Sequence, residues 1–186
     1  MPTHLFTYGT LMFQEVWQAI VCPDDVGRDF PSTPARLDGY QIFRVKDALY
    51  PGIIKSDPPP SPNPQSEVRN PKSRIPPPSG SRPSTLHSQP STVPGLLYLD
   101  LDSGLLARLD RFEDDFYRRQ HIVVACDNGR QLAVEAYIVP DERRDVLTTE
   151  PWSGDDFVAR GDLDRFLANF AGFQRVESPR PPGEAV

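Results

Sequence analysis

Four acidic side chains stand among aromatic and arginine residues in the stretch 109–119 (LDRFEDDFYRR) of the 186-residue chain. One of them, Glu113, lies where a helical pattern of apolar residues ends and a strand pattern begins. A carboxylate that is removed from water has a raised pKa, and a pKa near neutrality suits it to transfer protons. Glu113 is therefore a candidate general acid or base, although a solvated acidic helix end would show the same residue types. The three aspartates of the stretch are predicted to be solvated charges.

A second candidate segment is Tyr8-Gly9-Thr10-Leu11, which follows the first predicted strand and leads into a predicted helix. Backbone N–H groups in such a turn have no partners inside the helix and can bind an anion, aided by the helix dipole. The segment therefore indicates a binding site for a carboxylate. Taken alone, it is also typical of an ordinary turn between a strand and a helix, which is the commoner case.

Other kinds of catalytic site find few suitable residues in this sequence. The three histidines are scattered along the chain, and Cys22 and Cys126 have neither the spacing of a zinc site nor that of a disulfide framework. Glycine-rich phosphate loops, zinc-protease motifs and the Gly-x-Ser-x-Gly motif of hydrolases do not occur in the sequence. We predict no metal site and no organic cofactor.

Patterns of apolar residues predict the elements that must position these segments. Strands are expected at residues 3–8, 48–55, 93–99, 117–126 and 131–139, and also within 35–46, where Gly39 indicates a bulge or turn. Helices are expected at 13–21, 103–113 and 155–173. Asp102 is suited to cap the helix that carries Glu113, and Asp127-Asn128-Gly129 predicts a tight hairpin. Because strands outnumber helices and do not alternate regularly with them, we predict an α+β domain on a largely antiparallel, barrel-like sheet.

Composition changes sharply between residues 56 and 92, which hold eleven of the 22 prolines of the chain. Such a segment cannot bury enough apolar surface to offset the entropy of ordering it. We predict one domain at residues 1–176, interrupted by a disordered proline-rich insertion at 56–92 and followed by a disordered tail at 177–186. Pro-x-x-Pro spacings in the insertion would also suit a proline-binding module. Because such spacings arise easily by chance in a proline-rich segment, we favour a passive loop, and a protein partner of the insertion stays unknown.

Net charge and hydropathy limit the partners and the compartment. The formal net charge is -6 at pH 7, which disfavours binding to nucleic acid or to anionic membranes. The first residues lack the pattern of a signal peptide, and no apolar run approaches the roughly 20 residues that span a bilayer. We expect a cytoplasmic protein that binds neither nucleic acid nor membranes.

Four motifs, in this order, resemble those of the γ-glutamylcyclotransferase-like family. They are Tyr8-Gly9-Thr10-Leu11, Tyr50-Pro51-Gly52-Ile53, Pro94-Gly95-Leu96-Leu97-Tyr98 and Leu109-Asp110-x-x-Glu113-x-x-x-Tyr117-x-Arg119. The form Phe-Glu-Asp-x-x-Tyr-x-Arg of the last motif is similar to the branch of avirulence-induced plant proteins and their bacterial and fungal relatives. The resemblance covers residues 3–55 and 93–170 and skips the proline-rich segment.

The resemblance implies a small, mixed, mostly antiparallel β-barrel with flanking helices and a cavity at one end. In the family, the loop that matches Tyr8, Gly9, Thr10 and Leu11 holds the α-carboxylate of a small γ-glutamyl substrate. The substrate then cyclises to 5-oxoproline and releases an amine or amino acid, a reaction that uses no cofactor. The residues after the loop, 12–15 (MFQE), differ from the Gly-Gln-Pro-Asn of γ-glutamylamine enzymes, which leaves the substrate open.

The resemblance also assigns expected roles in the last motif. The glutamate that matches Glu113 is the catalytic acid/base of the family, and Tyr117 and Arg119 match positions that support the site or the fold. Two alternatives remain open at this point. The chain could be a non-catalytic protein that binds an amino-acid-like ligand in the same cavity, or it could carry out another small-molecule transformation there.

Overall fold

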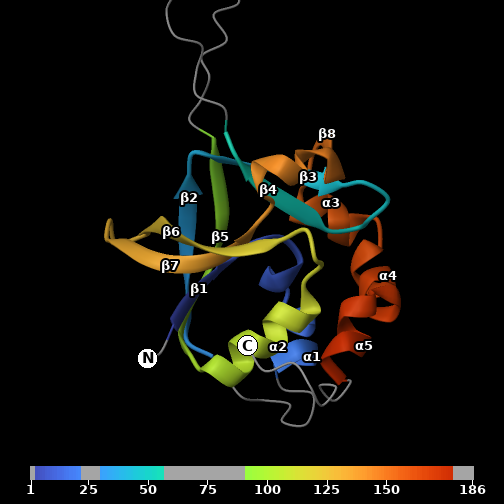
Figure 1. The fold of residues 1–186 in the computed structure, drawn as a ribbon, viewed down its shortest axis with the longest axis horizontal. Coiled ribbons are helices and arrows are strands. Elements are labelled where there is room, and N and C mark those ends of the chain that lie inside the picture. Colours follow the sequence, from blue (N-terminus) through green and yellow to red (C-terminus); the bar gives the residue numbers. More distant parts are fainter. Residues whose placement is uncertain (1–2, 22–29, 57–90, 178–186) are drawn as a thin grey trace, which may run out of the picture.

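The structure is a computed structural model that describes residues 3–21, 30–56 and 91–177 (Figure 1). Its elements are β1 (Thr3–Thr7), η1 (Gly9–Met12), α1 (Gln14–Val21), β2 (Ser32–Asp38), β3 (Tyr40–Val45), β4 (Pro51–Lys55), β5 (Thr92–Leu101), α2 (Ser103–Phe112), β6 (Arg118–Cys126), β7 (Gln131–Ile138), η2 (Asp141–Val146), β8 (Leu147–Pro151), α3 (Gly154–Ala159), α4 (Asp162–Asn169) and α5 (Ala171–Glu177). The predicted insertion and tail fall almost wholly outside the described residues.

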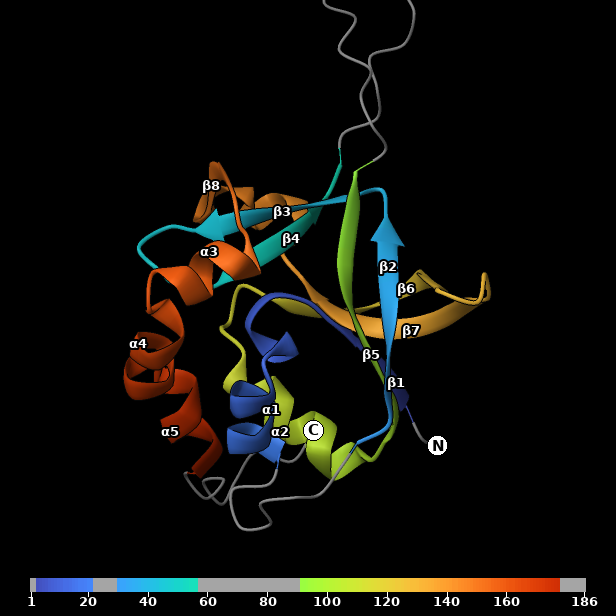
Figure 2. The same cartoon turned by 180° about the vertical axis from the view of Figure 1, so that it is seen from behind.

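Five strands close into a barrel in the order β1-β5-β2-β6-β7. Neighbouring strands are antiparallel except β1 and β7, which are parallel. Strands β4, β3 and β8 form a second, antiparallel sheet beside the barrel (Figures 1 and 2). Strand β4 is an edge of that sheet, where a strand that begins with Pro51 is tolerated. The chain is therefore α+β with a mixed, mostly antiparallel barrel and flanking helices, as the sequence predicts.

The alternation of side chains along β6 shows how the barrel encloses a core. Ile122 and Val124 are buried, whereas Val123 between them is exposed. The hairpin from β6 to β7 turns at Gly129, whose φ of +78° suits the predicted tight turn. Buried apolar side chains of the barrel strands fill the interior, among them Phe6, Leu37, Leu97, Val124 and Ala136.

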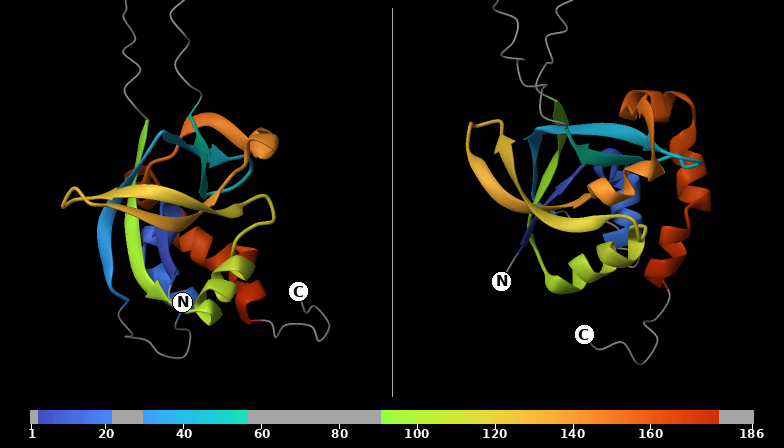
Figure 3. Two further views of the ribbon diagram at one scale, coloured as in Figure 1. Left: turned by 60° about the vertical axis from the view of Figure 1, so that its left-hand side comes forward. Right: turned by 45° about the horizontal axis from the view of Figure 1, so that its top comes forward.

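Helices α1, α2 and α5 pack against one another on one side of the barrel (Figure 3). Helix α2 begins as predicted, because the Asp102 carboxylate accepts a hydrogen bond from the N–H of Leu105 at 2.8 Å. The buried face of α2 consists of Leu105, Leu106, Leu109 and Phe112. Within the described parts of the chain, no helix combines the length and the apolar character needed to cross a membrane.

The single helix predicted for residues 155–173 is wrong, because three short helices, α3 to α5, replace it. Gly161 has a left-handed φ of 68°, and Phe170 is extended with ψ of 120°, so neither residue continues a helix. The apolar spacing stays helical across both breaks, which is why the pattern conceals them. The sequence pattern also misses β8, and the strand expected from residue 48 begins only at Pro51.

Candidate active site

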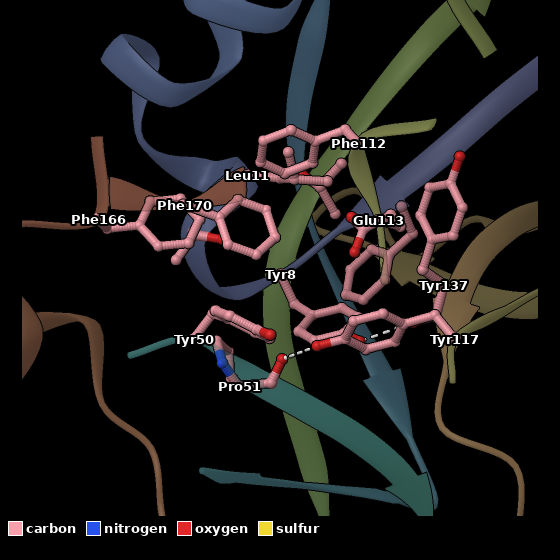
Figure 4. Close-up of a pocket in the computed structure, with 13 residues that line it drawn as sticks. Tyr8, Leu11, Tyr50, Pro51, Phe112, Glu113, Tyr117, Tyr137, Phe166 and Phe170 are labelled. Carbon is pink, nitrogen blue, oxygen red and sulfur yellow. Dashed lines mark hydrogen bonds between the residues drawn. The ribbon is translucent and has the colours of Figure 1, made fainter. Parts of the chain in front are cut away.

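A pocket lies where β1, η1 and β4 meet α2 and α4; it is partly open to solvent, and its cavity volume is about 20 Å³. Most of its lining is aromatic, and the side chains converge on it from distant parts of the chain (Figure 4). The lining residues are Phe6, Thr7, Tyr8, Thr10, Leu11, Tyr50, Pro51, Phe112, Glu113, Tyr117, Tyr137, Phe166 and Phe170. The pocket thus brings Glu113 together with three residues of the predicted binding loop.

Glu113 is the residue at which α2 ends. Its N–H still donates to the carbonyl of Leu109 at 3.1 Å, whereas its own backbone is extended, with φ of -68° and ψ of 152°. This change of direction after the last helical turn directs the Glu113 side chain into the pocket (Figure 4). Among the residues that the structure describes, none donates a hydrogen bond to the Glu113 carboxylate or forms an ion pair with it.

The surroundings of Glu113 change its acid–base behaviour. Burial raises the pKa of Glu113 to about 8, because the carboxylate loses hydration there, and the charge of Asp114 adds to the shift. Arg175 opposes the shift, and Asp110 raises the pKa slightly further. A carboxyl group with such a pKa is populated in both forms near neutral pH, so that it can both accept and donate a proton.

The predicted binding loop is held tightly against β4. Gly9 has a left-handed φ of +64°, and a Cβ atom at this position would lie 2.3 Å from Cγ of Pro51. The first N–H groups of η1, those of Gly9 and Thr10, have no acceptor inside the helix. Thr10 and Leu11 line the pocket, whereas Gly9 shapes the turn behind them.

Two buried tyrosines brace the floor of the pocket. The hydroxyl of Tyr8 donates to the carbonyl of Tyr137 at 2.7 Å and accepts from the N–H of Ile53 at 3.4 Å. The hydroxyl of Tyr117 donates to the carbonyl of Pro51 at 2.7 Å. Burial raises the pKa of both tyrosines well above the usual value, and nearby negative charge adds to each shift. Both hydroxyl groups therefore stay protonated and act as fixed donors.

Arg119, the other predicted supporting residue, lies outside the pocket lining. Its guanidinium forms an ion pair with Asp110, with Nε and Oδ1 2.9 Å apart, and a second ion pair with Glu135. These contacts join β6 to α2 and to β7. Of the two residues predicted to support the site, Tyr117 lines the pocket, whereas Arg119 connects α2, β6 and β7 through its ion pairs.

The prediction that the three aspartates of the motif are solvated charges is wrong for Asp114, whereas Asp110 is exposed as predicted but is also hydrogen-bonded. Asp110 accepts a hydrogen bond from the hydroxyl of Tyr137 at 2.8 Å. Asp114 accepts one from the hydroxyl of Tyr50 and another from the guanidinium of Arg175 at 2.9 Å. The third aspartate is exposed, as predicted. The two bonded carboxylates flank Glu113 and hold the tyrosines of the pocket wall.

Sequence reasoning misses much of the aromatic wall. Tyr50, which precedes β4, and Phe166 and Phe170 at the C-terminal helices all line the pocket. The helical spacing of the two phenylalanines indicates core packing, and both do pack in the core. The pattern carries no signal that their rings also face a pocket, because that depends on where α4 and α5 dock.

Solved structures of two plant proteins are among those similar to this fold. The solution structure of At3g28950.1 from Arabidopsis thaliana is 19% identical, with a TM-score of 0.56 over 94% of this chain and 82% of that chain. The solution structure of At5g39720.1 from the same plant is also 19% identical, with a TM-score of 0.52 over 96% of this chain and 95% of that chain. At such identities the likeness shows the fold alone. A search of curated proteins finds no significant match.

A family model gives the second line of comparison. The model described as "Gamma-glutamyl cyclotransferase, AIG2-like" matches residues 5–69 and 71–154. The match spans most of the chain and contains both the loop Tyr8–Leu11 and Glu113. It confirms the resemblance that the four motifs indicate. The chain therefore belongs to the γ-glutamyl cyclotransferase, AIG2-like family.

Proposed function

We propose that the chain is a γ-glutamyl cyclotransferase in which Glu113 is the general acid and base. One arrangement carries the proposal: the Glu113 carboxylate faces the same pocket as the loop Tyr8–Leu11. Burial raises the pKa of Glu113 to about 8, and none of the described residues forms a hydrogen bond or ion pair with its carboxylate. Family membership adds to it, since the family includes γ-glutamyl cyclotransferases. The substrate class is a γ-glutamyl amide, and the product is 5-oxoproline.

The reaction balances with one proton-transferring group. The α-amine nitrogen of the substrate attacks its own γ-carbonyl carbon, and the new C–N bond closes a five-membered ring. The amide C–N bond to the leaving amine then breaks. Glu113 takes the proton that the attacking amine loses and gives it to the leaving nitrogen, a type of transfer that contributes about 10²–10⁴-fold to rate.

The loop supplies the positioning in this proposal. The N–H groups of Gly9 and Thr10 would hold the α-carboxylate, so that the γ-glutamyl chain curls with its amine near its γ-carbonyl. Such fixed proximity can offset roughly 7–11 kcal/mol of an activation barrier when the geometry is good. Further backbone N–H groups of the loop would stabilise the oxyanion that forms on the γ-carbonyl oxygen.

The direct test is to incubate the protein with a panel of γ-glutamyl amino acids and γ-glutamyl amines and to measure 5-oxoproline by chromatography. We expect product from at least one member, together with an equal amount of the free amine. Binding of a panel member by calorimetry without any 5-oxoproline would contradict the proposal and would favour the non-catalytic binding protein of the same fold.

The pH dependence of the reaction tests the role of Glu113 as a base. The proton-accepting form is the carboxylate, so kcat/KM should rise as the pH increases through about 8. Asp114 raises the pKa of Glu113 and Arg175 lowers it. With one substrate throughout, Asp114→Asn should therefore move the inflection to lower pH, and Arg175→Gln should move it to higher pH. Asp115→Asn is the matched control, because that residue is exposed. Identical inflections in all these variants would contradict the assignment.

A further inference from the structure

The wall of the pocket across from Glu113 is aromatic. Phe166 and Phe170 lie on one side of the pocket in Figure 4, and Glu113 and Tyr137 lie on the other. The rings of Phe166 and Phe170 are stacked, with centroids 4.7 Å apart and an interplanar angle of 18°. The ring of Tyr50 meets Phe170 edge-on, with centroids 4.9 Å apart. These three rings form a continuous, largely apolar surface on one side of the pocket.

Phe170 takes this position because the chain breaks there. It ends α4 in an extended conformation, and α5 restarts at the next residue. The ring lies over Gly172, where a Cβ atom would approach Cε1 of Phe170 to 2.3 Å. Phe166 is buried, whereas Phe170 and Tyr50 are only partly buried. An aromatic side chain that packs in a cluster but leaves part of its ring exposed to a pocket is suited to contact a ligand.

The charged group closest to this aromatic wall already has hydrogen-bond partners within the protein. Of the described residues that line the pocket, Glu113 is the only carboxylate, and none is a lysine, arginine or histidine. Arg175 lies nearby, 5.6 Å above the ring of Phe170, but its guanidinium donates to the Phe112 carbonyl and to Asp114. A second charged group on the substrate would therefore find no free partner of opposite charge at the aromatic wall.

We infer that Tyr50, Phe166 and Phe170 form the subsite for the leaving amine and select γ-glutamyl amides of neutral, aromatic amines. The inference rests on the proposed function, in which the γ-glutamyl end occupies the loop and Glu113. The part of the substrate beyond the scissile amide then faces the three rings. An aromatic group there gains ring stacking and apolar burial, whereas a charged group loses hydration without compensation.

The test compares three substrates that share the γ-glutamyl group: γ-glutamylbenzylamide, γ-glutamylmethylamide and γ-glutamyl-ε-lysine. Because a single methylene group in an apolar pocket changes kcat/KM by about 10–200-fold, the benzylamide should exceed the methylamide by at least about tenfold. The lysine compound should be the poorest of the three. Phe170→Ala should reduce the ratio of benzylamide to methylamide to within about threefold of unity. Phe170→Leu, which keeps an apolar side chain, should give an intermediate ratio.

Phe173→Ala is the matched control. Phe173 packs on Phe112 and Phe166 with centroids 5.2 and 5.8 Å apart, but it does not line the pocket. Phe173→Ala should lower the free energy of unfolding about as much as Phe170→Ala does. The ratio of kcat/KM for the benzylamide to that for the methylamide should stay at its wild-type value. Equal kcat/KM for the methylamide and the benzylamide, or a preference for the lysine compound, would overturn the inference while leaving the proposed function intact. Absence of 5-oxoproline from every substrate would overturn the proposed function, and this inference with it.

Discussion

Replacing Glu113 by glutamine should lower kcat for 5-oxoproline formation by at least about 100-fold, because an amide can neither accept nor return the proton in this reaction. Glutamine has nearly the same size and shape, so the pocket should keep its form and KM should change little. Steady-state kinetics on the best substrate of the panel measures this effect. Circular dichroism should show the wild-type fold.

The same substitution should stabilise the protein at alkaline pH. The pKa of Glu113 rises from 4.5 to about 8 on folding, so the folded state binds this proton more tightly than the unfolded state. Tighter binding of this proton stabilises the folded state, and the stabilisation is fully present below pH 4.5. It is lost as the pH rises from 4.5 through about 8. At about pH 9 the variant should unfold with a free energy about 1–3 kcal/mol higher than wild type, and near pH 4 the two should agree.

Asp115→Asn again serves as the control for both effects, since it removes an exposed carboxylate two residues away. It should leave kcat and the pH dependence of unfolding at their wild-type values. Wild-type turnover in Glu113→Gln would assign the proton transfer to another group. An unfolding free energy that differs from wild type by the same amount at every pH would show that Glu113 is well hydrated in the folded protein.

Local sequence signals suffice to predict how Glu113 is positioned. Asp102 caps the start of α2, and the apolar residues at helical spacing end at Phe112, so the sequence predicts that the helix ends at about Glu113. The extended backbone of Glu113 follows from that stop, and its direction into the pocket follows from the burial of the α2 face. Cap, spacing and helix length are all properties of neighbouring residues, which is why the sequence predicts them.

The groups that tune and enclose Glu113 come from distant segments, and no local pattern predicts them. Tyr50 and Asp114, which share a hydrogen bond, are 64 residues apart, and Arg175 and Asp114 are 61 residues apart. Whether an aspartate is solvated or bonded depends on which element docks beside it. The break at Phe170 has the same origin: the residue is neither glycine nor proline, and the aromatic spacing continues across it. Tertiary packing decides both features.

Replacing Gly9 by alanine should lower both stability and activity. The left-handed φ of +64° costs an alanine about 1–2 kcal/mol, and overlap with Cγ of Pro51 at 2.3 Å adds roughly 1–3 kcal/mol. We expect a total loss of about 2–5 kcal/mol in the free energy of unfolding, measured by urea denaturation. Any shift that relieves the overlap moves Thr10 and Leu11 relative to Glu113, and a displacement of about 1 Å at a reacting centre can cost roughly 100-fold in rate.

Gly129→Ala separates the two causes of this loss. Gly129 also has a left-handed φ, of +78°, but nothing lies within 4 Å of its Cβ position, so alanine there meets the backbone strain without the overlap. It should cost about 1–2 kcal/mol and leave kcat/KM unchanged. An equal loss of stability in the two variants would show that Pro51 does not press on the loop.

A double substitution isolates the contact between the loop and β4. The atoms of Pro51 closest to the new Cβ are Cγ and Cδ, at 2.3 and 2.9 Å, whereas its Cβ is 3.8 Å away. Alanine at residue 51 keeps only Cβ, the most distant of these three atoms. The double variant Gly9→Ala/Pro51→Ala should therefore lose less free energy of unfolding than the sum of the losses in the two single variants. The difference, about 1–3 kcal/mol, measures the overlap. If activity returns together with stability, the close packing of Gly9 on Pro51 is what holds the loop at the correct distance from Glu113.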